Sequence, residues 1–229
     1  MRAILLAAGM GTRLKPLTNS IPKCLVKIKG EYLLEIWLEK LMNLGIDKIL
    51  INTHHLSDQV NNYLTKSKYK NKVEQSFEPK LLGTAGTLIA NLEFTLYEDV
   101  ILIHADKYCL SDLKEFICAH HNRPKNCVMT MLTFRTNNPD SCGVVEINEK
   151  GIVVNFHEKK PNPPSNLANG AVYIISPKLL HRFSKDLKML TDFSTEVINK
   201  FHGNIYTYET KELFIDIGTN ENLDKANNS

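Results

Sequence analysis

Short apolar runs, each long enough for one β-strand, alternate with segments of helical periodicity along the first 135 or so residues. Four such runs are Ala3–Ala7, Lys48–Asn52, Val100–His104 and Val128–Thr133. They are rich in Ile, Leu and Val, which is typical of strands buried on both faces, as in a parallel sheet. The alternation therefore predicts an α/β fold with right-handed crossovers.

Helices are expected between these runs. Between Tyr32 and Leu44 the apolar residues recur at helical spacing, and Gly45 supplies a stop signal. Three further segments are compatible with helices: Leu56–Leu64, Thr84–Leu92 and Ser111–His121. We therefore expect a Rossmann-like, mixed but mainly parallel sheet flanked by helices.

The pattern changes after about residue 140. Gly143–Asn148 and Gly151–His157 flank Glu149-Lys150, which indicates a β-hairpin, and Ala171–Ile175 predicts another strand. We interpret residues 1–229 as one domain. Its first part, to about residue 135, forms the main sheet, and the rest, from about 136 to 229, forms a smaller β-rich lobe and a closing segment.

Composition excludes several classes of protein. The 229 residues carry a formal net charge of only +3, which argues against a nucleic acid or a membrane surface as partner. No apolar run reaches the ~18 residues that a membrane-spanning helix needs. The five cysteines are an odd number and scattered, which fits a reducing, cytoplasmic compartment better than a disulfide framework.

The first strand runs into a loop that contains Gly9, Gly11, Thr12 and Arg13. Glycines at such a place let backbone N–H groups approach an anion closely. The loop lacks the third glycine of a dinucleotide fingerprint and the Gly-Lys-Ser/Thr of a Walker A loop. Ligands of open α/β sheets bind at the carboxyl ends of the strands, which is where this loop lies.

The residues after this loop extend it to Gly-x-Gly-Thr-Arg-Leu-x-Pro-Leu-Thr and then Pro22-Lys23. Arg13 and Lys23 place a planar fork and a point charge beside the anion-binding backbone, which suits a polyphosphate. With this long signature the sequence resembles the sugar-1-phosphate nucleotidyltransferases, in particular the short mannose-1-phosphate guanylyltransferase-type branch. Similar motifs continue along nearly the whole chain.

The resemblance implies where a nucleoside triphosphate binds. Leu82-Gly83-Thr84-Ala85-Gly86-Thr87 resembles the family's second nucleotide loop, and Ile103-His104-Ala105-Asp106 resembles the strand whose final aspartate binds Mg²⁺. Asp216-Ile217-Gly218-Thr219 is similar to the segment that completes the metal site. The nucleotide-binding residues so implied are Leu6, Ala7, Ala8, Gly9, Gly11, Thr12, Arg13, Glu78, Gly83 and Thr84.

The resemblance also implies a binding site for a sugar 1-phosphate. Cys142-Gly143-Val144-Val145 resembles the segment whose glycine lies against the sugar. In the segment Glu158-Lys159-Lys160-Pro161, Glu158 is expected on sugar hydroxyls and Lys160 on the sugar phosphate. Asn169-Gly170-Ala171 resembles the segment whose asparagine holds the sugar.

The implied reaction needs these residue types. An oxygen of the sugar phosphate attacks the α-phosphorus of the triphosphate, and pyrophosphate leaves. Positioning and charge neutralisation supply most of the rate when two anions react. We therefore expect Arg13, Lys23, Asp106 and Lys160 to be catalytic, with Mg²⁺ on Asp106 and Asp216. The nucleophile is already an anion, so no general base is required.

Glu78, five residues before Gly83, bears on the choice of base. A carboxylate can only accept hydrogen bonds, and guanine offers two adjacent donors, whereas uracil would place a carbonyl oxygen against it. We therefore prefer GTP. UTP, CTP or dTTP with another sugar phosphate or a phosphocholine-like substrate remains an alternative, as does a catalytically silent nucleotide-sugar-binding subunit. The sugar stays open among mannose, glucosamine and heptose 1-phosphates, and a homodimer is a plain guess.

Overall fold

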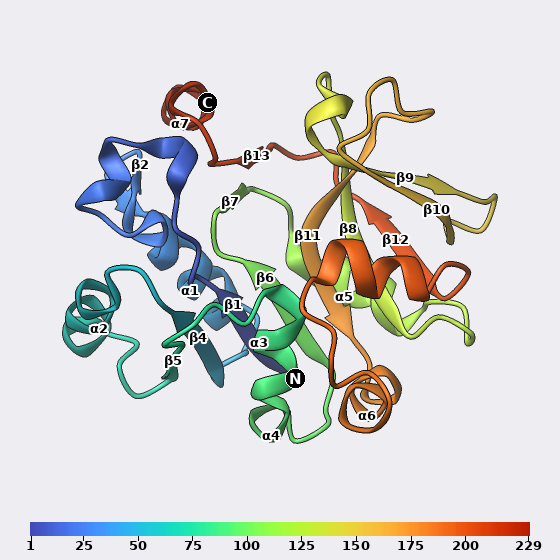
Figure 1. Cartoon of the computed structure of the whole chain (residues 1–229), viewed down its shortest axis with the longest axis horizontal. Helices are drawn as coiled ribbons and strands as arrows, with labels where there is room; N and C mark the ends of the chain where they lie inside the picture. The colour runs from blue at the N-terminus through green and yellow to red at the C-terminus, as the bar shows by residue number, and fades with distance from the viewer. The chain divides into compact units, whose positions relative to one another are not determined.

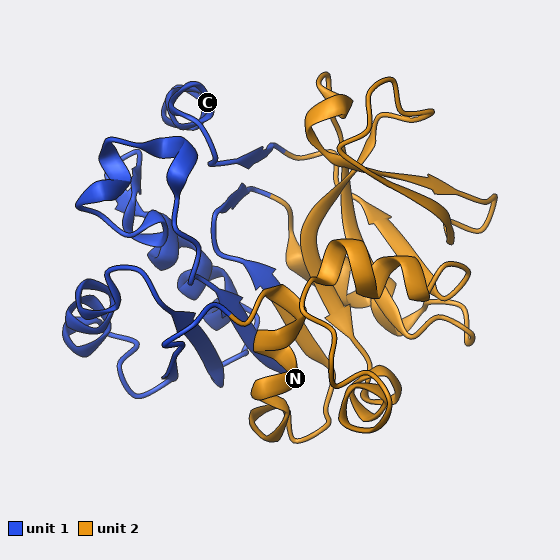
Figure 2. Ribbon diagram, viewed as in Figure 1, with its two compact units in different colours: residues 1–81, 103–110, 213–229 blue, residues 82–102, 111–212 orange.

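The computed structural model describes all 229 residues, which divide into two compact units (Figure 2). The first unit contains residues 1–81, 103–110 and 213–229, and the second contains residues 82–102 and 111–212. The chain therefore leaves the first unit, returns to it for eight residues, and returns again at its end. Strand β6 (Val100–His104) contributes residues to both units.

The first unit contains a parallel sheet. In it β1 (Arg2–Leu6) pairs with β4 (Ile49–Thr53), and β4 pairs with β5 (Val73–Phe77). The central residues of β1 and all of β4 are buried, as the apolar runs predicted. The register sets Leu6 opposite Asn52, so the ends of β1 and β4 lie at the same edge.

The spacing of the apolar residues explains why helix α1 (Leu33–Asn43) forms in the first unit. Leu34, Trp37, Leu38 and Leu41 are fully or almost fully buried on one side of the helix. The other helices of the unit are α2 (Ser57–Lys66) and α7 (Asn220–Asn227). The longest helix of the protein has 11 residues, and none is a candidate for a membrane span.

Short elements carry much of the first unit's chain (Figure 1). They are the 3₁₀ turns Thr12–Leu14, Leu17–Asn19 and Lys23–Leu25, the strand pair β2 (Lys27–Ile28) and β3 (Glu31–Tyr32), and the strand pair β7 (Lys107–Cys109) and β13 (Phe214–Asp216). Strands of two or three residues carry too little apolar periodicity to be recognised from the sequence.

The second unit is dominated by strands. Its strands are β8 (Met129–Arg135), β9 (Gly143–Ile147), β10 (Val153–Glu158), β11 (Leu167–Ile175) and β12 (Ile205–Glu209). The predicted hairpin is confirmed, since β9 and β10 pair antiparallel. The predicted mixed α/β class, with a mainly parallel sheet flanked by helices, is confirmed as well.

The prediction that Val128–Thr133 resembles the strands of the parallel sheet was wrong in one respect. The strand β8 pairs antiparallel with β11 and parallel with β12. Its first five residues are buried, so its sequence looks the same as that of a fully buried parallel strand. Burial on both faces therefore revealed the strand but not its direction.

The helical segments of the second unit are α3 (Thr84–Ala90), α4 (Leu92–Thr95), α5 (Leu113–His121), α6 (Pro177–Lys185), a π-helix at Phe193–Ile198 and a 3₁₀ turn at Pro139–Ser141. Helix α5 begins two residues later than predicted. The carboxylate of Asp112 accepts a hydrogen bond from the backbone N–H of Lys114, and Asp112 is therefore the N-cap.

Candidate active site

The glycine-rich loop after β1 is held in one conformation. Gly11 has a φ of 63°, and a Cβ on it would lie 2.8 Å from Cγ2 of Thr18. The hydroxyl of Thr18 donates a hydrogen bond to the carbonyl of Gly11 at 2.7 Å. Both the dihedral angle and the contact require glycine at this position. Thr12 and Arg13 follow directly in a 3₁₀ turn.

Asp106 and Asp216 are brought together by the pairing of β7 with β13 (Figure 1). The register sets Asp216 opposite Lys107, the residue after Asp106. The backbone N–H of Ile217 also donates to the carbonyl of Asp106 at 2.9 Å. Two aspartates 110 positions apart in the sequence are thus brought close together within one unit, with Asp216 at the end of β13 and Asp106 directly before β7.

Cations surround these two carboxylates. The ammonium of Lys23 lies 2.5 Å from Oδ2 of Asp106 and 3.8 Å from Oδ1 of Asp216. Arg13 lies 3.6 Å from Oδ2 of Asp216 and is packed on Gly218, where a Cβ would meet its guanidinium at 2.8 Å. The side chain of Arg13 is 63% exposed, whereas that of Lys23 is only 11% exposed.

Lys107 is a third cation in this cluster, and the sequence analysis missed it. Its ammonium lies 3.3 Å from Oδ1 of Asp106 and 3.1 Å from Oδ1 of Asp216. Its backbone carbonyl accepts a hydrogen bond from the indole N–H of the buried Trp37 at 2.8 Å. The available signal was its position directly after an aspartate that ends an apolar strand.

These contacts shift pKa values in opposite directions. Burial by itself would raise the pKa of Asp106, but the charges of Lys107 and Lys23 outweigh burial and hold that pKa well below its usual range. Burial likewise disfavours the ammonium of Lys107, but Asp106 and Asp216 outweigh burial and raise its pKa. Both Asp106 and Lys107 are therefore charged at neutral pH.

A small pocket opens beside the cluster. It has a volume of about 150 Å³ and is lined by Gly11, Thr12, Arg13, Lys23 and Gly218. Backbone groups and two cations on its wall suit a phosphate group. The Oδ1 atoms of Asp106 and Asp216 are buried and accept no well-formed hydrogen bond, although the ammonium of Lys107 is close to both. Two such oxygens fit the ligand preference of Mg²⁺.

Asn52 is a second residue that the sequence analysis missed. It lies in β4 opposite Leu6, and its Oδ1 accepts a hydrogen bond from the backbone N–H of Ala7 at 2.7 Å. Its Nδ2 donates to Oε1 of Glu78 at 2.8 Å, and Glu78 is only 2% exposed. The carboxylate of Glu78 is thus buried and hydrogen-bonded inside the first unit. Ala8 and Gly9 continue the glycine-rich loop from Ala7.

The second unit brings together predicted residues of its own. The register of β9 and β10 sets Gly143 opposite Glu158, and a Cβ on Gly143 would lie 2.7 Å from Oε2 of Glu158. Lys159 lies 3.1 Å from Oε1 of Glu158, and Lys160 follows in an exposed position. The absence of a side chain at Gly143 thus lets the carboxylate of Glu158 and the ring of Phe156 pack directly against its backbone.

Asn169 lies on the neighbouring strand β11 and is held by two hydrogen bonds. Its Nδ2 donates to the hydroxyl of Tyr173 at 2.7 Å, and its Oδ1 accepts from the backbone N–H of Ala171 at 2.9 Å. Tyr173 is fully buried, and burial raises the pKa of its phenol above the ordinary value. Residue 168, next to Asn169, pairs with Val144 of β9, which places the asparagine beside the hairpin.

Gly83 and Thr84 begin helix α3. The φ of Gly83 is 79°, and a Cβ there would lie 2.3 Å from the carbonyl oxygen of Thr191. The hydroxyl of Thr84 accepts a hydrogen bond from the backbone N–H of Phe193 at 2.7 Å, and the N–H of Ala85 donates to the carbonyl of Thr191. Both residues are therefore fixed against the segment that leads into the π-helix.

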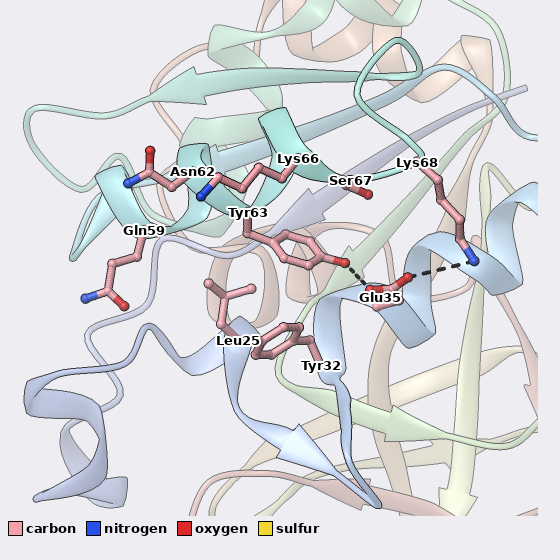
Figure 3. A pocket seen from close by; sticks show the side chains of 9 residues that line it. All are labelled: Leu25, Tyr32, Glu35, Gln59, Asn62, Tyr63, Lys66, Ser67 and Lys68. Carbon is pink, nitrogen blue, oxygen red and sulfur yellow. Dashed lines mark hydrogen bonds and ion pairs between the residues drawn. The ribbon is translucent and has the colours of Figure 1, made fainter.

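A larger pocket in the first unit contains none of the predicted site residues (Figure 3). It has a volume of about 560 Å³ and lies along α1 and α2. Figure 3 shows the hydroxyl of Tyr63 directed at Glu35, with a hydrogen bond of 2.6 Å, and Lys68 on the other side of the same carboxylate at 3.8 Å. Tyr63, Glu35 and Lys68 of this pocket are thus paired with one another.

Comparisons with known proteins find a family, similar sequences and similar structures. The model of the family described as "Nucleotidyl transferase" matches residues 2–229. "Mannose-1-phosphate guanylyltransferase catalytic subunit beta" of Drosophila melanogaster is 30% identical over 223 residues, which are 95% of this chain and 59% of that protein. This chain therefore spans about three fifths of that relative's length.

One further relative matches this chain along almost its whole length, and another carries the name of a UTP-dependent enzyme. "D-glycero-alpha-D-manno-heptose 1-phosphate guanylyltransferase" of Campylobacter jejuni is 28% identical and matches 96% of both chains. "UTP--glucose-1-phosphate uridylyltransferase" of Synechocystis is 30% identical over 79% of this chain and 50% of its own. The structure of HddC from Yersinia pseudotuberculosis complexed with GMP-PN has a TM-score of 0.83 and 26% identity, covering 99% of this chain and 98% of that one.

Proposed function

Because the chain belongs to the nucleotidyl transferase family, we propose that it joins a nucleoside triphosphate to a sugar 1-phosphate and releases pyrophosphate, with GTP as the preferred nucleotide. The observation that carries this proposal is the convergence of Arg13, Lys23, Asp106 and Asp216 beside the small pocket of the first unit. Two of these residues are cations that suit phosphate groups, and two are carboxylates.

The reaction is a displacement at phosphorus. An oxygen of the sugar phosphate forms a bond to the α-phosphorus, and the bond from the α-phosphorus to the bridging oxygen of the leaving pyrophosphate breaks. Arg13 is the most exposed cation of the cluster and is the residue that neutralises the triphosphate. The backbone of the Gly9–Arg13 loop fixes the orientation of the phosphates, and Lys23 keeps Asp106 in place.

Asp106 and Asp216 are the residues that would hold Mg²⁺, and when bound the ion supplies positive charge to the reacting phosphates. In the second unit, Glu158 and Asn169 would bind sugar hydroxyls, the backbone of Gly143 would lie against the sugar beside Glu158, and Lys160 would hold the sugar phosphate. Gly83 and Thr84 would contact the nucleoside. These roles rest on the motifs and on the local arrangement of each unit.

Two observations support GTP. Guanylyltransferases are among the relatives, and a similar solved structure contains GMP-PN, although a uridylyltransferase is also similar. Glu78 is the residue that would accept hydrogen bonds from the two donors of guanine. One of its oxygens, Oε1, also accepts a hydrogen bond from Asn52. The relatives include mannose-, heptose- and glucose-1-phosphate enzymes, so each of these sugar 1-phosphates is a candidate substrate.

The experiment that tests the proposal is a matrix of GTP, UTP, CTP, dTTP and ATP against a panel of sugar 1-phosphates with Mg²⁺, scored by pyrophosphate release. We expect release with GTP and at least one hexose or heptose 1-phosphate. Release with another nucleotide alone would overturn the GTP preference, and no sugar-dependent release in any combination would overturn the enzymatic proposal.

Glu78→Gln tests the origin of the base preference. If Glu78 contacts the base, the variant loses preference for GTP over UTP by roughly 10²-fold, because a mismatched polar group penalises the wrong base strongly. A change in KM that is equal for all nucleotides would instead show that Glu78 acts through Asn52 and the backbone of Ala7.

A further inference from the structure

The ammonium of Lys107 lies between the two carboxylates on which the proposed reaction depends. It is 3.3 Å from Oδ1 of Asp106 and 3.1 Å from Oδ1 of Asp216. The remaining oxygens of the two carboxylates face other cations, since Oδ2 of Asp106 contacts Lys23 and Oδ2 of Asp216 contacts Arg13. Lys107 therefore contacts Oδ1 of both carboxylates, and Lys23 also lies 3.8 Å from Oδ1 of Asp216.

The position of Lys107 is set by its surroundings. The residue lies in β7 opposite Asp216 of β13, and its carbonyl is held by Trp37. Its side chain is only 12% exposed. The backbone of Lys107 cannot move without breaking the β7–β13 pairing, whereas its four-carbon side chain can change rotamer.

Charge and space both oppose a divalent cation while Lys107 stays in this position. The two carboxylates already face three cations, Lys23, Lys107 and Arg13. An ion at the usual ~2.1 Å from Oδ1 of Asp216 could lie no farther than about 5 Å from the ammonium of Lys107. At such a separation two positive groups repel strongly in a partly buried site.

We propose that Lys107 competes with the divalent cation for Oδ1 of Asp106 and Asp216, so that the protein without nucleotide binds the cation weakly and binds it firmly only together with a polyphosphate. The polyphosphate would contribute the negative charge that compensates both the ion and the displaced ammonium. This inference rests on the proposed function for the identity of the polyphosphate. The competition of Lys107 for Asp106 and Asp216 does not depend on which polyphosphate binds.

The test uses the full chain, without nucleotide, and Mn²⁺ as the probe. Free Mn²⁺ is measured by electron paramagnetic resonance during a titration of the wild type and of Lys107→Met, which keeps an unbranched side chain of similar length. We expect Lys107→Met to bind Mn²⁺ at least about tenfold more tightly, since one nearby positive charge has been removed. Mn²⁺ should also raise the Tm of this variant more than that of the wild type.

Three controls separate competition from a general change of charge. Lys107→Arg keeps the charge and should bind Mn²⁺ as weakly as the wild type. Lys66→Met removes an exposed lysine of the first unit and should also leave the affinity unchanged. Adding Asp216→Asn to Lys107→Met should remove the gain, because one of the two oxygen ligands is weakened.

Equal Mn²⁺ affinity in the wild type and Lys107→Met would overturn the proposal. Tight Mn²⁺ binding by the wild type in the absence of nucleotide would overturn it as well. If Lys107→Met does not fold, Lys107→Gln, which also removes the charge but keeps a polar side chain, takes its place; it must show the same gain in Mn²⁺ affinity, and no gain would overturn the proposal. None of these measurements needs turnover, so failure here is distinguishable from failure of the pyrophosphate-release assay.

Discussion

The two units build their candidate sites in different ways. In the first unit, charged side chains from positions 13, 23, 106, 107 and 216 converge on one small volume, and each is stabilised by the opposite charges around it. In the second unit, Gly143 and Glu158 face each other within one hairpin, and Asn169 is held by the neutral hydroxyl of Tyr173. The first site depends on long-range convergence and charge balance, whereas the second depends on strand register.

The largest effect is expected where the charge balance is broken. Asp106→Asn keeps the size of the side chain but removes the charge that Lys23 and Lys107 face. We expect kcat to fall at least about 10²-fold, as for other losses of a charged group at a reacting centre. The measurement is steady-state pyrophosphate release, with circular dichroism to check the fold.

The matched control is Asp58→Asn, on the exposed face of α2 in the same unit. It removes the same charge from the chain and should leave kcat unchanged. Wild-type activity in Asp106→Asn would remove this carboxylate from the reaction and leave it a purely structural ion-pair partner.

An intermediate effect is expected in the second unit. Glu158→Gln should raise KM for the sugar 1-phosphate about tenfold, because hydrogen bonds to a charged acceptor are stronger than those to an amide. The KM for the nucleoside triphosphate should stay unchanged if the contrast between the two units is correct. Initial rates at varied concentrations of each substrate separate the two constants.

Glu146→Gln provides the comparison within the same hairpin, since Glu146 lies on β9 and pairs with His157 at 2.7 Å. It should leave both KM values near those of the wild type. An equal rise of both KM values in Glu158→Gln would contradict the division of labour, because it would show that Glu158 also affects the nucleotide.

The smallest effect concerns stability in acid. The pKa of Asp106 is lowered in the folded protein relative to its unfolded value of about 4, so the unfolded chain binds more protons in acid. This contribution to stability is present above about pH 4 and is lost as the pH falls further. Urea unfolding of the wild type between pH 5 and 2.5 should lose on the order of 2 kcal/mol more than Asp106→Asn does. Parallel pH profiles for the two proteins would contradict the charge balance described here.

The sequence predicted the apolar strands of the first unit because burial on both faces leaves a continuous run of Ile, Leu and Val. It did not predict β5, whose residues Glu74, Gln75 and Ser76 are polar and only partly buried or exposed. Nor did it give the direction of β8. Strand direction depends on partners far along the chain, and apolar periodicity carries no information about them.

Of the charged cluster, Arg13, Lys23, Asp106 and Asp216 were recognised through motifs, not through geometry. Lys107 and Asn52 were missed because neither belongs to a motif with a known role. Asn52 ends an apolar run, and Lys107 follows an aspartate at the end of another. Attention to every polar residue at the carboxyl end of a predicted parallel strand would have found both.

The position of a divalent cation in the protein decides whether Asp106 and Asp216 form a metal site. Crystals of the wild type grown with Mn²⁺ and a non-hydrolysable nucleoside triphosphate allow the ion to be located by anomalous scattering. We expect one strong peak within bonding distance of carboxylate oxygens of both Asp106 and Asp216, with the phosphates near Arg13. A bound nucleotide whose Mn²⁺ lies away from both aspartates would contradict it.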